Sequence, residues 1–223
     1  MRIVRPATQQ SSHRRRARHI ASAALGLVLI GAAAPSPAAA QSLVPPPGEA
    51  AALEDCNRRA CALLLEKKRE GADLQCELTK TWPEATIRRA DHPAVRWRFG
   101  DARCSVNLIL KRADVVAALS KPEYETTLGA HRVSCTIADG GQERTVAATV
   151  APKVVFAQGK AQKIWVNLIG TEGNKVLADF LWLAVKLEDS TGVFHAAMIT
   201  AINRYIYERC PSKYPQALAG GKG

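Results

Sequence analysis

Histidine, catalytic serine motifs and glycine-rich phosphate loops are scarce or missing in this chain. Three of the five histidines lie beyond residue 40, and none shows the i, i+4 spacing of a helical metal pair: His92, His131 and His195. None of the six serines beyond residue 40 stands in a G-x-S-x-G or S-x-x-K motif. The glycines at 170–173 lack the lysine of a phosphate-binding loop, and we interpret them as a turn before an N-cap at Asn174. We therefore expect no cofactor and no metal, and no catalytic residue is identified by a local motif.

Long apolar runs are also lacking beyond the first forty residues. The strongest candidate, residues 176–187, is shorter than the roughly 20 residues that a membrane-spanning helix needs, and it contains Asp179 and Lys186. We therefore expect no transmembrane segment after residue 40.

The first forty residues have the features of a secretory signal peptide. Arginines at 14–16 and 18 precede an uncharged apolar run at 20–34, and an A-x-A site at 38–40 precedes Gln41. No cysteine stands at the cut, so lipid attachment there is excluded. We expect cleavage after Ala40 and a destination in the bacterial periplasm, or outside the cell, where cysteines are oxidised.

Cleavage would lower the charge of the protein. Residues 1–40 hold six arginines and no acidic residue, so the 31 basic residues of the whole chain fall to 25 against 20 acidic ones, and the net charge falls from +11 to +5. A mildly basic exported protein suits an anionic surface. Its compartment and its modest charge both argue against nucleic acid as a partner.

The chain beyond the signal divides into one domain and two short flanks. Residues 41–48 include three consecutive prolines and are expected to form a disordered lead-in. Residues 215–223 are rich in glycine and are expected to form a disordered tail. Residues 49–214 are long enough for a single domain with its own core.

Apolar side chains recur at helical spacing in the first part of this domain and at strand spacing after it. The spacing predicts a helix at 49–69, with Gly71 ending it, and a brief helix at 113–119. Polar and apolar side chains alternate in three segments, which predicts half-buried strands at 74–79, 104–108 and 132–137. A tight hairpin is expected at 139–141. Further strands are expected at 96–99, 144–150, 153–156 and 163–169.

The C-terminal third is expected to be mainly helical. Residues 174–188 fit either a helix or a buried strand, and we favour the helix. Residues 192–210 show clear helical spacing, and Pro211 is expected to end that helix. The fold class is therefore α+β, with an N-terminal helix, an antiparallel sheet of about six strands, and C-terminal helices that cover one face of the sheet.

Six cysteines lie beyond the predicted cut: Cys56, Cys61, Cys76, Cys104, Cys135 and Cys210. In an exported chain this even number predicts three disulfides, which leaves fifteen connectivities open. Cys56 and Cys61 should not pair, because residues five apart on a helix stand about 8 Å apart. Cys56, Cys61 and Cys210 belong to helices expected to cover the face of the sheet to which Cys76, Cys104 and Cys135 point. We therefore predict three helix-to-sheet bridges and no free thiol.

Five arginines within sixteen residues form the strongest local anomaly: Arg88, Arg89, Arg96, Arg98 and Arg103. On a strand, Arg96 and Arg98 would share one face while Trp97 pointed the other way. Such a surface could hold anionic lipid, lipopolysaccharide phosphates or an acidic envelope protein. The alternative is that the arginines only keep an edge strand from pairing with other chains.

Three functions remain open, and each predicts a different surface. The first is a non-enzymatic periplasmic binding domain that contacts an anionic envelope component or a partner protein through the arginines. The second is a carrier that holds an apolar ligand between the sheet and its helices, for which an empty apolar cavity would be evidence. The third is a hydrolase whose site is dispersed in sequence, and it would need a pocket with converging polar groups.

Overall fold

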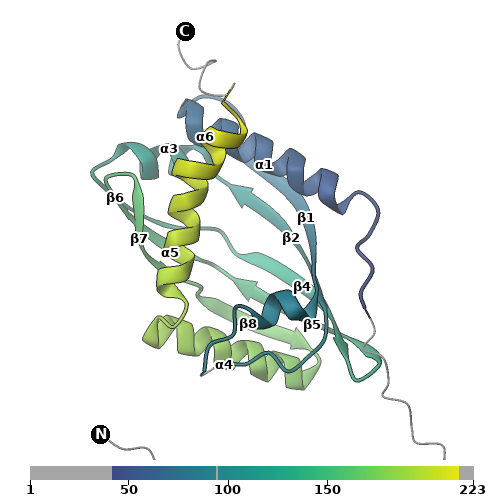
Figure 1. Ribbon diagram of the computed structural model, residues 1–223. Coiled ribbons are helices and arrows are strands. Elements are labelled where there is room, and N and C mark those ends of the chain that lie inside the picture. Colours follow the sequence, from purple (N-terminus) through teal and green to yellow (C-terminus); the bar gives the residue numbers. More distant parts are fainter. Residues whose placement is uncertain (1–41, 94, 216–223) are drawn as a thin grey trace, which may run out of the picture. The chain divides into compact units, whose positions relative to one another are not determined.

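Figure 1 shows the computed structural model of the protein, which describes residues 42–93 and 95–215. The predicted signal peptide and residues 216–223 of the predicted tail lie outside the described residues. The predicted α+β class is confirmed, but the eight strands form two antiparallel sheets instead of one sheet of about six.

The larger sheet has five strands and the smaller sheet has three. The larger is ordered β1 (Leu74–Trp82), β2 (Ala102–Leu110), β4 (His131–Asp139), β5 (Gln142–Val150) and β8 (Leu168–Gly173). The smaller is ordered β3 (Glu123–Thr127), β6 (Lys153–Ala157) and β7 (Lys160–Trp165). The helices are α1 (Glu49–Glu66), α2 (Glu84–Arg88), α3 (Arg112–Ser120), α4 (Lys175–Thr191) and α5 (His195–Arg204), followed by a π-helical turn η1 (Tyr205–Arg209) and α6 (Cys210–Lys213).

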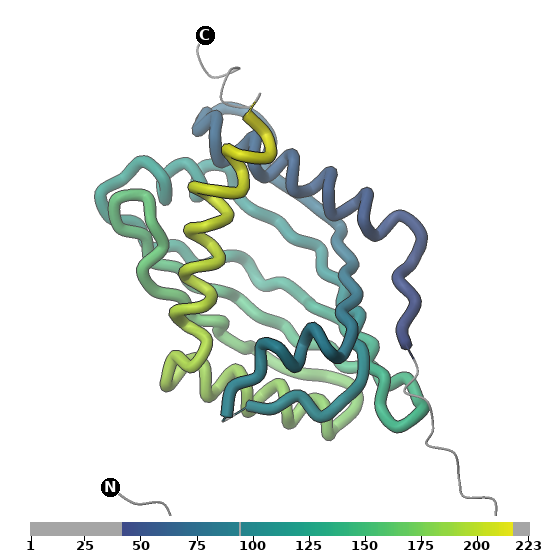
Figure 2. The backbone as a smooth tube through the Cα atoms, viewed as in Figure 1, coloured from purple at the N-terminus to yellow at the C-terminus, as the bar shows by residue number. Residues whose placement is uncertain are grey.

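The helices gather on one face of the larger sheet. Helix α1 packs against β1, α4 packs against β8 and β5, and α5 packs against β7 of the smaller sheet. The tube in Figure 2 shows α5 running between the region of α4 and the region of α1. The opposite face of the larger sheet presents exposed side chains from β2 and β4, including Ser105, Asn107 and Ser134. The predicted cover of one face by C-terminal helices is confirmed.

Helix α4 settles the ambiguity at 174–188. The Asn174 side chain accepts the Leu177 N–H at 3.2 Å, which makes Asn174 the N-cap that the turn interpretation expects. Leu177 is 1 % exposed and packs with buried residues of the sheet, Ile137 and Val146 among them. This packing holds α4 against the sheet.

Two strand predictions are wrong. The single strand expected at 163–169 is two strands of different sheets, β7 and β8. The chain breaks between them because the Asp189 carboxylate of α4 accepts the Val166 and Asn167 N–H groups at 2.7 and 3.1 Å, and because Asn167 has a φ of 49°. Residues 96–99 form no strand. The Trp97 N–H instead donates to the Asp91 carboxylate at 3.0 Å.

Two predicted helix ends are also wrong. Helix α1 ends at Glu66 and not at residue 69, because its C-cap Lys67 already lies in the left-handed region with a φ of 52°. Pro211 does not end the C-terminal helix. It lies in the first turn of α6, after a π-helical turn has already shifted the hydrogen bonding.

The disulfides depart from the predicted helix-to-sheet pattern in two of three cases. Cys56–Cys76 joins α1 to β1 as predicted, but Cys61–Cys210 joins α1 to α6 and Cys104–Cys135 joins β2 to β4. The register of the sheet explains this, because it places Cys104 directly opposite Cys135. The predicted absence of a Cys56–Cys61 bridge is confirmed, and no cysteine of the described chain is free.

The proline-rich segment before α1 packs onto the domain, contrary to the disordered lead-in expected there. Leu43 is 5 % exposed, and its N–H donates to the Asp101 carboxylate at 3.0 Å. The Ser42 hydroxyl and the Glu84 N–H donate to the same carboxylate at 3.0 and 2.7 Å. Burial opposes ionisation of Asp101, but these hydrogen bonds outweigh it and hold the pKa of Asp101 below its ordinary value.

Candidate functional site: an apolar pocket

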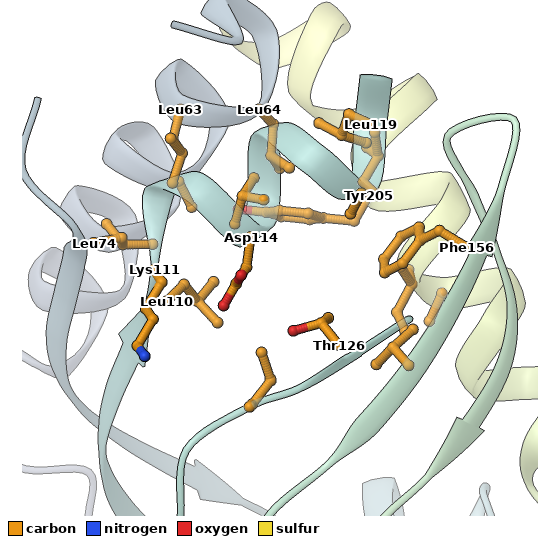
Figure 3. Close-up of a pocket in the computed structure, with 18 of the residues that line it drawn as sticks. Leu63, Leu64, Leu74, Leu110, Lys111, Asp114, Leu119, Thr126, Phe156 and Tyr205 are labelled. Carbon is orange, nitrogen blue, oxygen red and sulfur yellow. The ribbon is translucent and has the colours of Figure 1, made fainter. Parts of the chain in front are cut away.

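A pocket of about 490 Å³ lies between α1, α3, the smaller sheet and the α5–η1 segment. Figure 3 shows side chains from opposite walls, including Leu63, Leu119 and Phe156, pointing into a common space. The volume falls within the range of about 300–1,000 Å³ that is typical of small-molecule sites.

The apolar walls follow from the periodicity of each element. On α1, Leu63 and Leu64 continue the helical stripe that the sequence predicts. On β6, Val154 and Phe156 are two residues apart and therefore face the same side. Thr126 of β3 stands directly opposite Val154 in the antiparallel pairing, so it shares this face and enters the pocket.

Helix α5 and the η1 turn supply the remaining wall. Ile202, Tyr205 and Ile206 line the pocket from this segment. The Cys210 N–H donates to the Tyr205 carbonyl, five residues back, which defines the π-helical turn. Such turns are frequent at functional sites. Because Cys210 is bonded to Cys61 of α1, a disulfide ties together two of the elements that form the pocket.

Five polar side chains line the pocket: Lys111, Asp114, Thr126, Tyr205 and Arg209. The Tyr205 hydroxyl donates to Asn57 Oδ1 at 3.1 Å, and burial raises the pKa of Tyr205. Asp114 accepts the Tyr124 hydroxyl at 2.7 Å. Both hydroxyls are therefore already engaged with protein acceptors.

The two cations of the lining form no ion pair within the described chain. Lys111 and Arg209 are exposed although they line the pocket, so they lie at its opening. Neither forms an ion pair with any residue that the structure describes. The pocket thus has an apolar interior and a positively charged entrance.

This lining contains no histidine, cysteine or serine. The buried His131 accepts the Ile109 N–H at 3.1 Å between β2 and β4, and His195 bonds to the Ile164 carbonyl at 3.1 Å. The His92 ring packs edge-on against Phe194, with centroids 6.0 Å apart. Within residues 42–93 and 95–215, no three acidic, histidine or cysteine side chains gather as a metal site would require. The geometry suits binding of an apolar group.

The predicted arginine cluster lies elsewhere and is divided. Arg88 and Arg89 belong to the region of α2, where Arg88 pairs with Glu84 at 2.7 Å and Arg89 donates to the Thr86 hydroxyl at 3.0 Å. Arg103 projects from the uncovered face of β2 and donates to the Val44 carbonyl at 3.1 Å.

Arg96 and Arg98 are exposed, while Trp97 between them packs against Phe99 and Phe180 with ring centroids 5.1 and 5.8 Å away. The alternation expected of these residues is present although the segment is not a strand. Arg88 and Arg89 thus stand at the end of α2, Arg96 and Arg98 in the connection from α2 to β2, and Arg103 in β2 itself.

The sequence did not locate the pocket. The apolar run at 176–185 does not line it: Phe180 packs against Trp97, and Trp182 is 52 % exposed. The one sign of the pocket in the sequence is that Val154 and Phe156 stand two residues apart on a strand, which shows that they share a face but not what that face meets.

Among the described residues, no helix is both long and apolar enough to cross a bilayer. No family model, no curated protein and no solved structure matches the chain, so its function must be inferred from its own side chains.

Proposed function

We propose that this protein is an exported, non-enzymatic carrier that binds an apolar ligand in the pocket between α1, α3, the smaller sheet and η1. The observation that carries the proposal is the pocket itself, which has about 490 Å³ of space enclosed mainly by leucine, valine, isoleucine, alanine and phenylalanine side chains. A filled core would leave no such space, because protein interiors pack as densely as organic crystals.

The magnitude of the binding follows from the apolar area that a ligand would bury. A chain of about ten methylenes gains on the order of 8 kcal/mol when it leaves water, at about 0.8 kcal/mol for each CH₂. Association and ordering offset several kcal/mol of this gain. The Cys61–Cys210 and Cys56–Cys76 bonds hold the walls in place before the ligand arrives, which reduces the ordering cost. A dissociation constant between about 10 μM and 1 mM is therefore expected.

The compartment is part of the proposal. Three disulfides are typical of proteins that fold in an oxidising environment. Together with the signal-peptide features of residues 1–40, they support export to the periplasm, where an apolar molecule needs a carrier to cross water.

A second function, contact with an anionic lipid, lipopolysaccharide or an acidic envelope protein, is favoured by Arg96 and Arg98. Both are exposed, and neither forms an ion pair with a residue of the described chain. Contact between these two arginines and an anionic envelope surface would hold the carrier there without involving the pocket.

The test of the carrier is a blocked pocket. Ala201 and Ala197 are both exposed residues of α5, one helical turn apart, and only Ala201 lines the pocket. Ala201→Trp should fill the opening, whereas Ala197→Trp should add the same indole outside it. Binding is measured by the fluorescence of 1-N-phenylnaphthylamine, an apolar probe, in titrations with the mature protein.

The expected result is saturable binding to wild type and to Ala197→Trp, with affinity at least about tenfold weaker for Ala201→Trp. Circular dichroism checks that both variants fold. Absence of saturable binding to wild type, or equal affinity in both variants, would overturn the proposal.

A further inference from the structure

The entrance of the pocket differs chemically from its interior. Of the three charged residues in the lining, Lys111 and Arg209 are cations without an ion-pair partner in the described chain, and Asp114 is the one acid. Asp114 is held from the other side by the Tyr124 hydroxyl, 2.7 Å away. A hydrogen bond from a neutral hydroxyl leaves the negative charge of Asp114 in place, so the lining holds two positive charges and one negative charge, a net charge of +1, and neither cation forms an ion pair with Asp114.

Arg209 is the better placed of the two cations to recognise an anion. It also borders two further pockets, beside Arg204 and beside Lys213, and is exposed, so that its guanidinium is reachable from solvent. A guanidinium presents a planar fork of N–H donors that matches a carboxylate or phosphate with two parallel hydrogen bonds. Lys111, at the start of α3, adds a second positive charge on a different wall.

We propose that the ligand is a single-chain anionic amphiphile, whose chain occupies the apolar interior and whose headgroup binds Arg209, with Lys111 contributing charge. This inference rests on the proposed carrier function and names the ligand class. The volume limits the chain to one, because a water molecule occupies about 30 Å³ and the pocket therefore has room for on the order of fifteen atoms of similar size. The unpaired cations select a negative headgroup over a neutral or positive one.

The experiment compares ligands that share one chain and differ only in the headgroup. Dodecanoate, dodecyl phosphate, dodecanol and dodecyltrimethylammonium each displace the fluorescent probe from the mature protein. Dodecanoate or dodecyl phosphate should bind at least about tenfold more tightly than dodecanol, and dodecyltrimethylammonium should bind most weakly. The stronger of the two anions distinguishes a fatty acid from a lipid phosphate as the source of the headgroup.

The matched variants are Arg209→Gln and Arg204→Gln. Arg204 is an exposed arginine of the same helical segment, pairs with Glu208 at 3.5 Å and does not line the pocket. Arg209→Gln should abolish the preference for the anion and leave dodecanol binding unchanged, whereas Arg204→Gln should keep the preference.

Failure of this inference differs from failure of the carrier proposal. Equal affinity for dodecanol and both anions in wild type would overturn the anionic ligand and leave the apolar carrier standing. A loss of dodecanol and anion binding by equal factors in Arg209→Gln would assign Arg209 to the shape of the pocket and overturn its headgroup role. No displacement by any of the four ligands would overturn both proposals.

Discussion

The Cys61–Cys210 disulfide should contribute more to stability than either of the other two bonds. It links α1 to α6 across a sequence separation of 149 residues, whereas the separations of Cys104–Cys135 and Cys56–Cys76 are 31 and 20. A cross-link stabilises the native state mainly by restricting the unfolded chain, and the restriction grows with the logarithm of loop length. The perturbation is the double variant Cys61→Ala with Cys210→Ala.

The expected magnitudes follow from the loop lengths. The chain-entropy relation gives about 5 kcal/mol for the 149-residue separation and about 4 kcal/mol for the 31-residue separation, a difference of about 1.4 kcal/mol before rounding. Packing acts in the same direction, because Cys61 and Cys210 are 1 % and 0 % exposed and their truncation leaves a buried void, whereas Cys104 and Cys135 are only half-buried.

The assay is urea unfolding of the oxidised mature protein, followed by tryptophan fluorescence. With an m-value of about 2 kcal/mol/M, the double variants at Cys61–Cys210 and Cys104–Cys135 should differ in midpoint by about 0.7 M. A Cys104→Ala, Cys135→Ala variant that unfolds at the same urea concentration as the Cys61–Cys210 variant, or at a lower one, would refute the loop-length reasoning. The Cys61–Cys210 variant should also bind the apolar probe more weakly, because two walls of the pocket are no longer joined.

Three further predictions concern acid stability, export and the exposed arginines. Burial opposes ionisation of Glu49, but hydrogen bonds from the Thr81 N–H and hydroxyl, at 3.0 and 2.7 Å, outweigh it and lower the pKa of Glu49. The ionised Glu49 therefore stabilises the fold above about pH 4.5, and this stabilisation is lost as the pH falls through the native pKa. Glu49→Gln should therefore cost about 2 kcal/mol in the free energy of unfolding at pH 7 and much less at pH 3, measured by urea midpoints at both pH values. N-terminal sequencing of the exported protein should begin at Gln41, and a chain that retains Met1 would contradict the signal peptide. Arg96→Ala with Arg98→Ala should change stability by less than about 0.5 kcal/mol but weaken salt-sensitive binding to phosphatidylglycerol vesicles, and a large loss of stability with unchanged binding would show that the pair is structural.

The sequence by itself determined the features that depend on local spacing. Alternation over a few residues identified β1, β2 and β4, and helical spacing identified α1 and α3, because side chains of a strand repeat every two residues and those of a helix about every 3.6. Helix α4 was favoured for the same reason, but a buried helix and a buried strand are both continuously apolar. The placement of three sheet cysteines on one face was also predictable from alternation.

Only the tertiary structure decided which elements meet. The pairing of Cys104 with Cys135 depends on the register between β2 and β4, and register is a long-range property. The break between β7 and β8 depends on Asp189, about twenty residues away on α4, which accepts two backbone N–H groups at the break.

The pocket is also a feature that only the tertiary structure decided. Its walls come from eight helices and strands. Leu63 or Val154 has the same local pattern whether it meets another side chain or an open space. Sequence periodicity states which face of an element is apolar, while the distance between two such faces is set by the packing of the whole chain. Whether the interior is filled or hollow was therefore decided by the tertiary structure alone.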